Sequence, residues 1–446
     1  MHIQQVQIKN FRCFEDLTVN LNPDVNIFVG NNGSGKSAVL DAIAAALYPY
    51  LVELQSAIET DPELSNIPSF PIFQRDLPSK EITNEYFNES KFCVSMSEFP
   101  EWEVTYTKRV NGIGDSPLSF AYEEYSENIF EQPQLVAINR LLENLKNNTD
   151  TQLLVIAYYK VSRDLKNITN IKKLSAQSFD RFDSLKNPFD AISNFTDLAN
   201  WFFTRELQEL REGKKRKDID FEFSDLKQIR KAITTVIAPN ARIYFSQTES
   251  TQLMVEWETE TGEKIELSLN QLSSGYRNML ALVMDFARRL AQANPQMENP
   301  LEAEAVLMID ELDFHLHPTW QQKIIPDLRK VFPNTQIIAT THSPEIVTTV
   351  ERHQVKILED YQIKECPTPT RGRTSSDIVR DVLGLNNLRP DTKESETLAA
   401  LFDAIDNNNL EEAKKLREEL QDWEMFDAEI TRADMQIQRL KRKLSA

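Results

Sequence analysis

The sequence predicts a mixed α/β fold, and three stretches carry that prediction. Residues 26–41 place an apolar strand pattern before a glycine-rich turn and a helical pattern. Residues 305–311 form another apolar strand pattern, which ends in two carboxylates. From residue 270 onward, helical and strand patterns alternate, which is typical of a sheet covered by helices. The chain has 446 residues, enough for two or three hydrophobic cores.

The turn in the first stretch fits the phosphate-loop pattern of Gly, four residues, Gly-Lys-Ser. Its glycines let backbone N–H groups close around phosphate oxygens, and the following helix turns its positive dipole end toward the anion. Lys36 is expected to reach the β- and γ-phosphates, and the Ser37 hydroxyl to occupy a Mg²⁺ position. The candidate nucleotide ligands are Gly30, Asn31, Asn32, Gly33, Ser34, Gly35, Lys36 and Ser37.

Alternating apolar residues predict a small antiparallel sheet beside the loop. The alternation covers residues 2–9 and then 17–21, and residues 91–110 resemble a hairpin. The helix after the loop is expected to run to about Leu54. Residues 59–80 are rich in Pro, Ser and Asp, which indicates an irregular surface connection.

The middle of the chain is expected to be mostly helical. Residues 133–148 have one apolar helical face, and residues 175–236 are more polar. The continuous apolar run 153–159 predicts a buried strand. Residues 241–269 hold two alternating strands.

The C-terminal half is expected to alternate before it becomes helical. Residues 361–374 predict a polar linker, and residues 375–446 predict helices. The preceding elements are helix 274–292, strand 305–310, helix 318–332, strand 335–340, a helix near 344–350 and strand 354–359.

The composition limits the classes of partner and compartment. The formal net charge is −19, so contact with nucleic acid needs a local basic patch. Cys13, Cys93 and Cys366 are far apart and odd in number, which argues against a disulfide framework. We find no secretory signal, and no apolar run approaches the roughly 20 residues that span a bilayer. We therefore expect a cytoplasmic protein without a membrane partner.

A cationic cluster at residues 211–217, which includes Lys214–Lys217, is long enough to notice. Two interpretations stay open: a solvated loop, or a contact for DNA, RNA or a partner protein. Arg371 and Arg373 are a lesser candidate.

Two carboxylates follow the apolar strand 305–309. Asp310 is placed to hold Mg²⁺, usually through water, and Glu311 to orient or deprotonate an attacking water. An apolar run ending in Asp-Glu is common by itself. Together with a phosphate loop, it predicts the second half of the same site.

Histidines occur at two places near this predicted edge. His342 follows the strand 336–339, where it can contact a γ-phosphate, although a lone histidine is more often structural. His315 and His317 suggest zinc, but their spacing is poor and no cysteine or third histidine lies nearby.

Ser273, Ser274 and Gly275 precede a long helical pattern. A Ser-Ser-Gly at a helix start can present N–H groups and a hydroxyl to an anion, or it can be an ordinary N-cap. It lies more than 230 residues beyond the phosphate loop, with an insertion between them. That separation suits a segment that meets nucleotide on another subunit.

These motifs together resemble ABC-type ATPases of the SMC and RecF kind, and residues 8–14 look like the strand and turn with which that group begins. Further motifs are similar to the stand-alone ATPases of bacterial anti-phage systems, notably the Septu ATPase PtuA and its retron-associated relatives. The overcoming-lysogenization-defect (OLD) ATPases are close to this class. The further motifs lie at residues 309–318, 320–321, 333–336, 341–344, 376–383 and 389–390.

The resemblance implies an ABC-type ATPase head, with a mixed core sheet flanked by helices, an antiparallel β subdomain, a helical insertion and a helical C-terminal region. It implies Mg²⁺-dependent ATP hydrolysis with Glu311 as the catalytic carboxylate and His342 as the γ-phosphate sensor. Ser37 and Asp310 would bind the metal.

The resemblance also implies that residues 273–275 reach nucleotide in trans and that Asp313 lies at a dimer interface. The family has a glutamine loop that reaches the metal. Gln132 and Gln134 are candidates for it, and residues 158–163 look like a strand end that faces nucleotide. Arg12 and Arg163 are weaker candidates for the site.

Four domains are expected on this basis. Residues 1–123 would form the N-terminal half of the head, and residues 124–240 a mostly helical insertion. Residues 241–360 would form the C-terminal half of the head, and residues 361–446 a helical region for a partner or for oligomerisation.

The favoured hypothesis is an ATPase subunit of an anti-phage defence complex that dimerises head-to-head around ATP and controls a nuclease or other effector. The effector would be another chain, because residues 361–446 lack the acidic pattern of a topoisomerase-primase nuclease domain. Basic patches could contact DNA or retron RNA/DNA. One alternative is a RecF- or SMC-like repair ATPase that clamps DNA, although residues 124–236 show no sustained heptads. Another is a scaffold for which hydrolysis is incidental.

Overall fold

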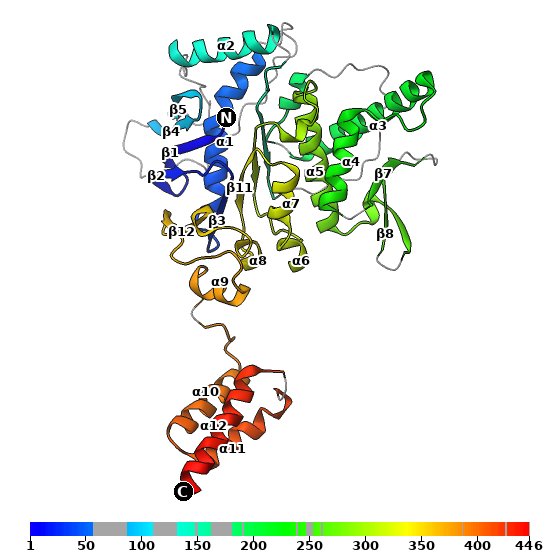
Figure 1. Ribbon diagram of the computed structural model, residues 1–446. Helices are drawn as coiled ribbons and strands as arrows, with labels where there is room; N and C mark the ends of the chain where they lie inside the picture. The colour runs from blue at the N-terminus through cyan, green and yellow to red at the C-terminus, as the bar shows by residue number, and fades with distance from the viewer. Residues whose placement is uncertain are drawn as a thin grey trace, which may run out of the picture. The chain divides into compact units, whose positions relative to one another are not determined.

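The chain forms two compact units, Met1–Ile378 and Val379–Ala446 (Figure 1). Residues 59–80, expected to be an irregular connection, lie outside the described residues. The computed structural model describes residues 1–56, 87–109, 132–147, 150–161, 181–189, 191–237, 240–246, 253–259, 262–385, 387–423 and 426–445.

A six-stranded mixed sheet forms the core of the first unit, in the order β13-β12-β3-β11-β10-β6. Every neighbouring pair is parallel except β12 and β13. The carboxyl ends of the five parallel strands therefore meet at one edge, where ligands of such sheets bind. The strands are β3 (Val25–Gly30), β6 (Val155–Tyr159), β10 (Ala305–Ile309), β11 (Thr335–Thr340), β12 (Val355–Glu359) and β13 (Gln362–Glu365).

A four-stranded antiparallel sheet lies beside the core, in the order β2-β1-β4-β5. Its first strands alternate between buried and exposed residues, as the sequence pattern predicts. The strands are β1 (Ile3–Phe11), β2 (Phe14–Asn20), β4 (Phe87–Met96) and β5 (Phe99–Arg109).

Helix α1 (Lys36–Ser56) packs between the two sheets and contacts β1, β4 and β5 as well as β3 and β11 (Figure 1, blue). The Trp102 indole donates to the Ala46 carbonyl at 3.0 Å. Residues Lys36–Leu54 are long and apolar enough to span a membrane, so the expectation that no such run exists is wrong. This segment is 78% buried inside the protein, and its burial against two sheets accounts for its apolar character.

A three-stranded sheet forms where the sequence predicted two strands. It consists of β7 (Arg242–Phe245), β8 (Leu253–Glu258) and β9 (Lys264–Ser268). Leu269 to Gln271 then form one 3₁₀ turn, which leads into the long helix α5 (Ser274–Ala293).

The helix expected over residues 318–332 is two helices, α6 (Pro318–Gln321) and α7 (Ile324–Val331). Pro326 gives the physical reason, because a proline inside a helix has no N–H to donate and its ring clashes with the carbonyl four residues earlier. The short helix α8 (Pro344–Val347) follows β11.

Residues 124–240, expected to be a mostly helical insertion, supply β6 of the core sheet and several helices. The helices are α2 (Gln132–Asn147), α3 (Ala191–Arg216) and α4 (Ser224–Val236), with the 3₁₀ helix η3 (Arg181–Leu185) before α3. These helices are expected from the apolar face of residues 133–148 and from the helical patterns in 175–236.

The second unit is a small helical bundle that begins within α9 (Ser375–Asp381). It contains α10 (Lys393–Asp406), α11 (Leu410–Glu419) and α12 (Ala428–Ser445). The linker expected over 361–374 contains β13, an edge strand of the core sheet, so that expectation is wrong there. The core of the bundle is Leu398, Leu401, Ala404, Ile405, Ala413, Leu420, Ile430 and Ala433.

Candidate functional site

The glycine-rich loop leaves the carboxyl end of β3 and is held by close backbone contacts. A Cβ on Gly30 would lie 2.3 Å from the carbonyl oxygen of Leu358 on the neighbouring β12. Gly35 has φ +102°, and a Cβ there would lie 2.7 Å from the Phe14 ring. Only glycine satisfies these contacts without a shift, so the fold itself imposes part of the loop sequence.

Lys36 lies nearly buried over this loop. Its Nζ donates to the carbonyl oxygens of Gly30 at 3.0 Å and Asn31 at 2.9 Å. Burial lowers the pKa of the Lys36 ammonium, while the nearby carboxylates of Asp310 and Glu311 oppose that effect. The ammonium thus lies against the loop backbone at the start of α1.

The loop fits a phosphate group. The Ser34 Oγ is buried and has no hydrogen-bond partner within the described residues, so a phosphate oxygen would satisfy it. The loop also sits at the N-terminus of the 21-residue helix α1, whose first N–H groups need an acceptor.

Asp310 follows β10 and is only 4% exposed. Its Oδ1 accepts the Ser37 hydroxyl at 3.0 Å and the Thr340 hydroxyl at 2.6 Å. The Asp310 N–H donates to the carbonyl of Tyr159 at the end of β6, at 2.9 Å. The sequence separates Ser37 from Asp310 by more than 270 residues, yet the sheet brings them into contact.

The Ser37 and Asp310 oxygens fit Mg²⁺, which is usually bound by one or two protein oxygens together with phosphates and water. Among the described residues, the structure has no cluster of three or more His, Cys, Asp or Glu that could hold a metal by itself. A Mg²⁺ ion held by Ser37 and Asp310 would take its other ligands from phosphate and water oxygens.

Glu311 adopts a left-handed backbone conformation, with φ +47°. A non-glycine residue in this region is strained, and the surroundings must hold it. The Glu311 N–H donates to the Thr340 hydroxyl at 2.7 Å, and the next N–H, of Leu312, donates to the Thr340 carbonyl at 2.9 Å. Thr340 thereby fixes the position from which the partly exposed Glu311 carboxylate projects.

Asp313 and His342 meet at the same edge. Asp313 Oδ1 accepts the His342 N–H at 3.1 Å and also the Thr341 hydroxyl. The His342 side chain is exposed. The structure brings these two predicted residues together and leaves the imidazole accessible.

Ser273 caps α5, with its hydroxyl accepting the Tyr276 N–H at 3.4 Å. A Cβ on Gly275 would lie 2.3 Å from the His315 carbonyl oxygen, so this glycine permits close contact with the segment after Glu311. Ser273 is exposed and Ser274 partly exposed. Within the described part of one chain, no hydrogen bond joins either serine to the phosphate loop.

Arg12 reaches the neighbourhood of the site, and its Nη1 lies 2.7 Å from Oδ2 of Asp41 on α1. Gln134 donates to the Glu101 carbonyl at 2.5 Å, which attaches it to the antiparallel sheet and not to Ser37 or Asp310. Among the described parts of the glutamine-loop candidates, Tyr159 at the start of 158–163 contacts Asp310, since its carbonyl accepts the Asp310 N–H. Arg163 lies outside the described residues, as does the Gln132 side chain.

Local contacts account for His315 and His317, the pair that suggested zinc. His317 caps α6, with its Nδ1 accepting the Thr319 N–H at 3.4 Å. His315 has φ +62° and an exposed side chain, and its ring contacts Phe314. These contacts agree with the structural interpretation of this pair.

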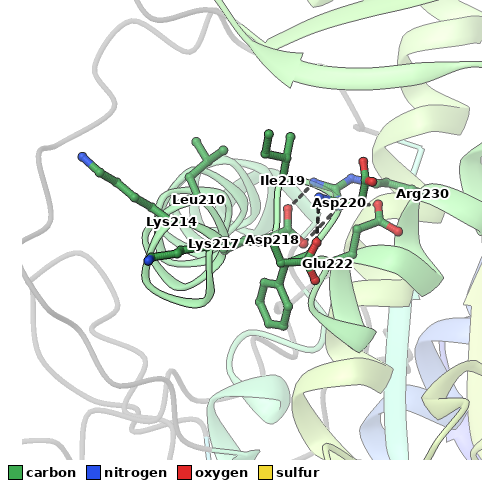
Figure 2. Close-up of a pocket in the computed structure, with 11 residues that line it drawn as sticks. Leu210, Lys214, Lys217, Asp218, Ile219, Asp220, Glu222 and Arg230 are labelled. Carbon is green, nitrogen blue, oxygen red and sulfur yellow. Dashed lines mark hydrogen bonds and ion pairs between the residues drawn. The ribbon is translucent and has the colours of Figure 1, made fainter.

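The basic cluster 211–217 covers the end of α3, at a hollow of about 850 Å³ (Figure 2). Lys214 projects from the last turn of α3, Lys217 directly follows that helix, and the next loop supplies Asp218 and Asp220. Arg216 Nε lies 2.8 Å from a Glu212 carboxylate oxygen. The charge here is therefore mixed, and lysines in the last turn also complement the negative end of the α3 dipole.

Sequence reasoning missed Thr340 and Asp41. Asp41 lies four residues after Ser37, hence on the same face of α1, and that spacing is the signal that could have found it. Thr340 is the last residue of β11, directly before the segment that contains His342.

The model of the AAA ATPase domain family matches residues 1–347. The retron Vc95 probable ATPase of Vibrio cholerae serotype O1 biovar El Tor is 26% identical over 94% of this chain and 86% of its own length. The retron Ec83 probable ATPase of Escherichia coli is 25% identical, covering 93% and 82%. The Septu protein PtuA of Bacillus thuringiensis is 24% identical, covering 87% and 85%.

Among solved structures, an Smc head bound to the C-winged helix domain of ScpA aligns with a TM-score of 0.41 and 15% identity. That alignment covers 82% of this chain and 96% of the other.

Proposed function

This chain belongs to the AAA ATPase domain family. On that premise, we propose that the chain is the ATP-hydrolysing subunit of an anti-phage defence complex. The convergence of Lys36, Ser37, Asp310 and Glu311 at one sheet edge carries the ATPase part of the proposal. The names of the full-length relatives, two retron probable ATPases and a Septu protein, support the defence part.

The residues at the edge divide the reaction between them. The loop N–H groups and Lys36 bind the phosphates, and Ser37 with Asp310 would hold Mg²⁺. When bound, Mg²⁺ neutralises charge that develops on the phosphate oxygens. Glu311 orients a water against the γ-phosphorus and accepts its proton, while the bond to the β-phosphate oxygen breaks and ADP leaves with inorganic phosphate.

Two positions serve this chemistry indirectly. Thr340 holds the backbone of Glu311 and the carboxylate of Asp310, so it positions both groups. His342 is exposed at the edge and would contact the γ-phosphate once nucleotide is bound.

We further propose that a second copy of the chain completes the site. Ser273 and Ser274 present hydroxyls at the start of the 20-residue helix α5. Within the described residues, neither serine forms a hydrogen bond with the phosphate loop. A head-to-head dimer would place these serines against the partner's nucleotide, with Asp313 near the contact.

The effector is proposed to be a separate chain, such as a nuclease, that reads the nucleotide state. The compact unit Val379–Ala446 is a candidate for its attachment, since it has its own apolar core and contains none of the proposed nucleotide ligands. The repair-type alternative predicts a chain that works with DNA and without a dedicated effector. Copurification from the native operon separates the two, because a bound nuclease or reverse transcriptase is expected only for the first.

The Glu311→Gln variant tests the catalytic assignment. It should bind ATP normally and lose at least about 100-fold in turnover, because the amide cannot accept the proton. Glu345→Gln is a matched control on α8. Unchanged ATP turnover and unchanged phage protection in the Glu311 variant would contradict the proposal.

A further inference from the structure

At the edge of the site, the Asp41 carboxylate on α1 forms ion pairs with cationic side chains from two other elements. Its Oδ2 lies 2.7 Å from Arg12 Nη1, and its Oδ1 lies 3.5 Å from Lys160 Nζ. Arg12 belongs to the turn between β1 and β2, and Lys160 directly follows β6. The Asp41 side chain is only 14% exposed, so solvent screens this cluster weakly.

The position of Lys160 follows from the register of the core sheet. Tyr159 on β6 pairs with Ile309 on β10, so Lys160 leaves the sheet next to Asp310. The Asp310 N–H donates to the Tyr159 carbonyl at 2.9 Å, which locks the two strand ends together. Lys160 therefore starts at the same edge and level as the two proposed catalytic-site carboxylates.

The Lys160 ammonium has a defined place at this edge. It lies 5.3 Å from the centroid of the Tyr158 ring, and burial together with the nearby Asp41 carboxylate raises the pKa of the Tyr158 hydroxyl. The Lys160 side chain is 39% exposed, against 14% for Asp41. The carboxylate is thus the buried anchor, and the ammonium is the part that faces outward.

We propose that Lys160 is a second cationic ligand for the terminal phosphate of ATP, and that Asp41 is the positioning residue that holds it. This inference rests on the proposed function, because it assumes nucleotide at the phosphate loop. An ammonium has three donors, so one can point to Asp41 while another meets a phosphate oxygen. A cluster with a purely structural role would join three elements without affecting the choice between ATP and ADP.

Equilibrium binding of fluorescent ATP and ADP analogues to the full-length chain tests the proposal, with and without EDTA. Lys160→Met should reduce the ratio of ATP to ADP affinity by about tenfold or more, as expected for a lost charge-assisted hydrogen bond. Lys160→Arg should retain most of the ratio. The matched control is Lys364→Met. Lys364 lies on β13, the edge strand opposite β6, and its Nζ lies 2.6 Å from a carboxylate oxygen of Glu359.

Asp41→Asn should lower the same ratio, because an amide cannot hold the ammonium by charge. The Asp41→Asn/Lys160→Met double variant should be no worse than Lys160→Met alone, since both changes remove one interaction. Additive losses in the double variant would contradict the positioning role. A lower melting temperature with an unchanged ratio in both single variants would make the cluster structural.

Lys36→Ala separates this inference from the proposed function. If Lys36→Ala abolishes nucleotide binding and Lys160→Met leaves the ATP to ADP ratio unchanged, the Lys160 proposal is wrong and the ATPase site stands. If the wild-type chain binds neither nucleotide, the proposed function fails with it.

Discussion

The hydroxyl of Thr340 donates to Oδ1 of Asp310 at 2.6 Å. The same hydroxyl accepts the Glu311 N–H at 2.7 Å, so one buried side chain on β11 fixes two consecutive residues at the end of β10. The proposed metal ligand and the proposed catalytic base are therefore set by the neighbouring strand, and their geometry depends on the register between β10 and β11.

Replacing Thr340 by valine should weaken both catalysis and stability. The change keeps the shape of the side chain and leaves the Glu311 N–H without its acceptor, which costs about 1–3 kcal/mol of unfolding free energy. We expect turnover to fall at least about tenfold, because Glu311 loses its fixed position. Urea unfolding and steady-state ATP hydrolysis measure the two effects.

Thr335→Val is the matched control at the other end of β11. Thr335 is fully buried, and its hydroxyl has no partner among the described residues, so its loss should be neutral or stabilising. Equal losses of activity in the two variants would show that Thr340 has no special role.

The buried charge network on α5 predicts a pH-dependent stability. Burial raises the pKa of Asp285, but Arg289 and Arg288 outweigh that effect and hold it below its usual value of 3.8. Asp285 therefore contributes stability that is fully present above about pH 4 and is lost as pH falls through its lower folded-state pKa. Its partners are Arg289 Nε at 2.9 Å, Arg288 Nη2 at 2.7 Å and the Tyr159 hydroxyl at 2.7 Å.

Asp285→Asn should cost roughly 3–5 kcal/mol at neutral pH, because it leaves the fully buried Arg289 without its counter-ion. The difference between wild type and variant should shrink as the pH falls below 3.8. Urea unfolding between pH 3 and pH 7 measures it. A difference that is constant across this range would contradict the ionised pair.

The C-terminal unit should be separable from catalysis. Leu401 is fully buried in the core of this bundle, so Leu401→Ala should destabilise Val379–Ala446 by about 2–5 kcal/mol. ATP hydrolysis should remain unchanged, since the proposed nucleotide ligands lie in the first unit. Calorimetry and hydrolysis assays give the two readouts.

Leu388→Ala is the control within the same unit, because Leu388 is 44% exposed. A loss of hydrolysis in Leu401→Ala but not in Leu388→Ala would show that the bundle supports the ATPase, contrary to the expectation.

Contiguous sequence was enough to predict the strands and turns that deliver the site. The phosphate loop and the Asp310-Glu311 pair can each be recognised from a pattern of about ten residues, because a buried strand must be apolar and a phosphate turn must contain glycine. The third strand of the small sheet, β9, and the edge strand β13 were missed, since short, largely exposed strands lack a clear apolar pattern.

The contacts between distant segments could not be predicted in the same way. Thr340 and Asp41 acquire their roles from strand register and from the face that α1 turns to the sheets, which no local pattern reports. The break between α6 and α7 was predictable from Pro326, and the apolar length of α1 reflects burial on two sides.

The central claim is that two copies complete each nucleotide site, and complementation between two inactive variants tests it most directly. Lys36→Ala disables the phosphate loop, and Ser274→Arg blocks the surface proposed to act in trans, so each variant alone should be inactive. Mixed in equal amounts, half of the dimers would combine the two chains with one intact site of two, and about a quarter of wild-type hydrolysis should return. No recovery from variants that demonstrably co-assemble, or full hydrolysis by Ser274→Arg alone, would contradict the claim.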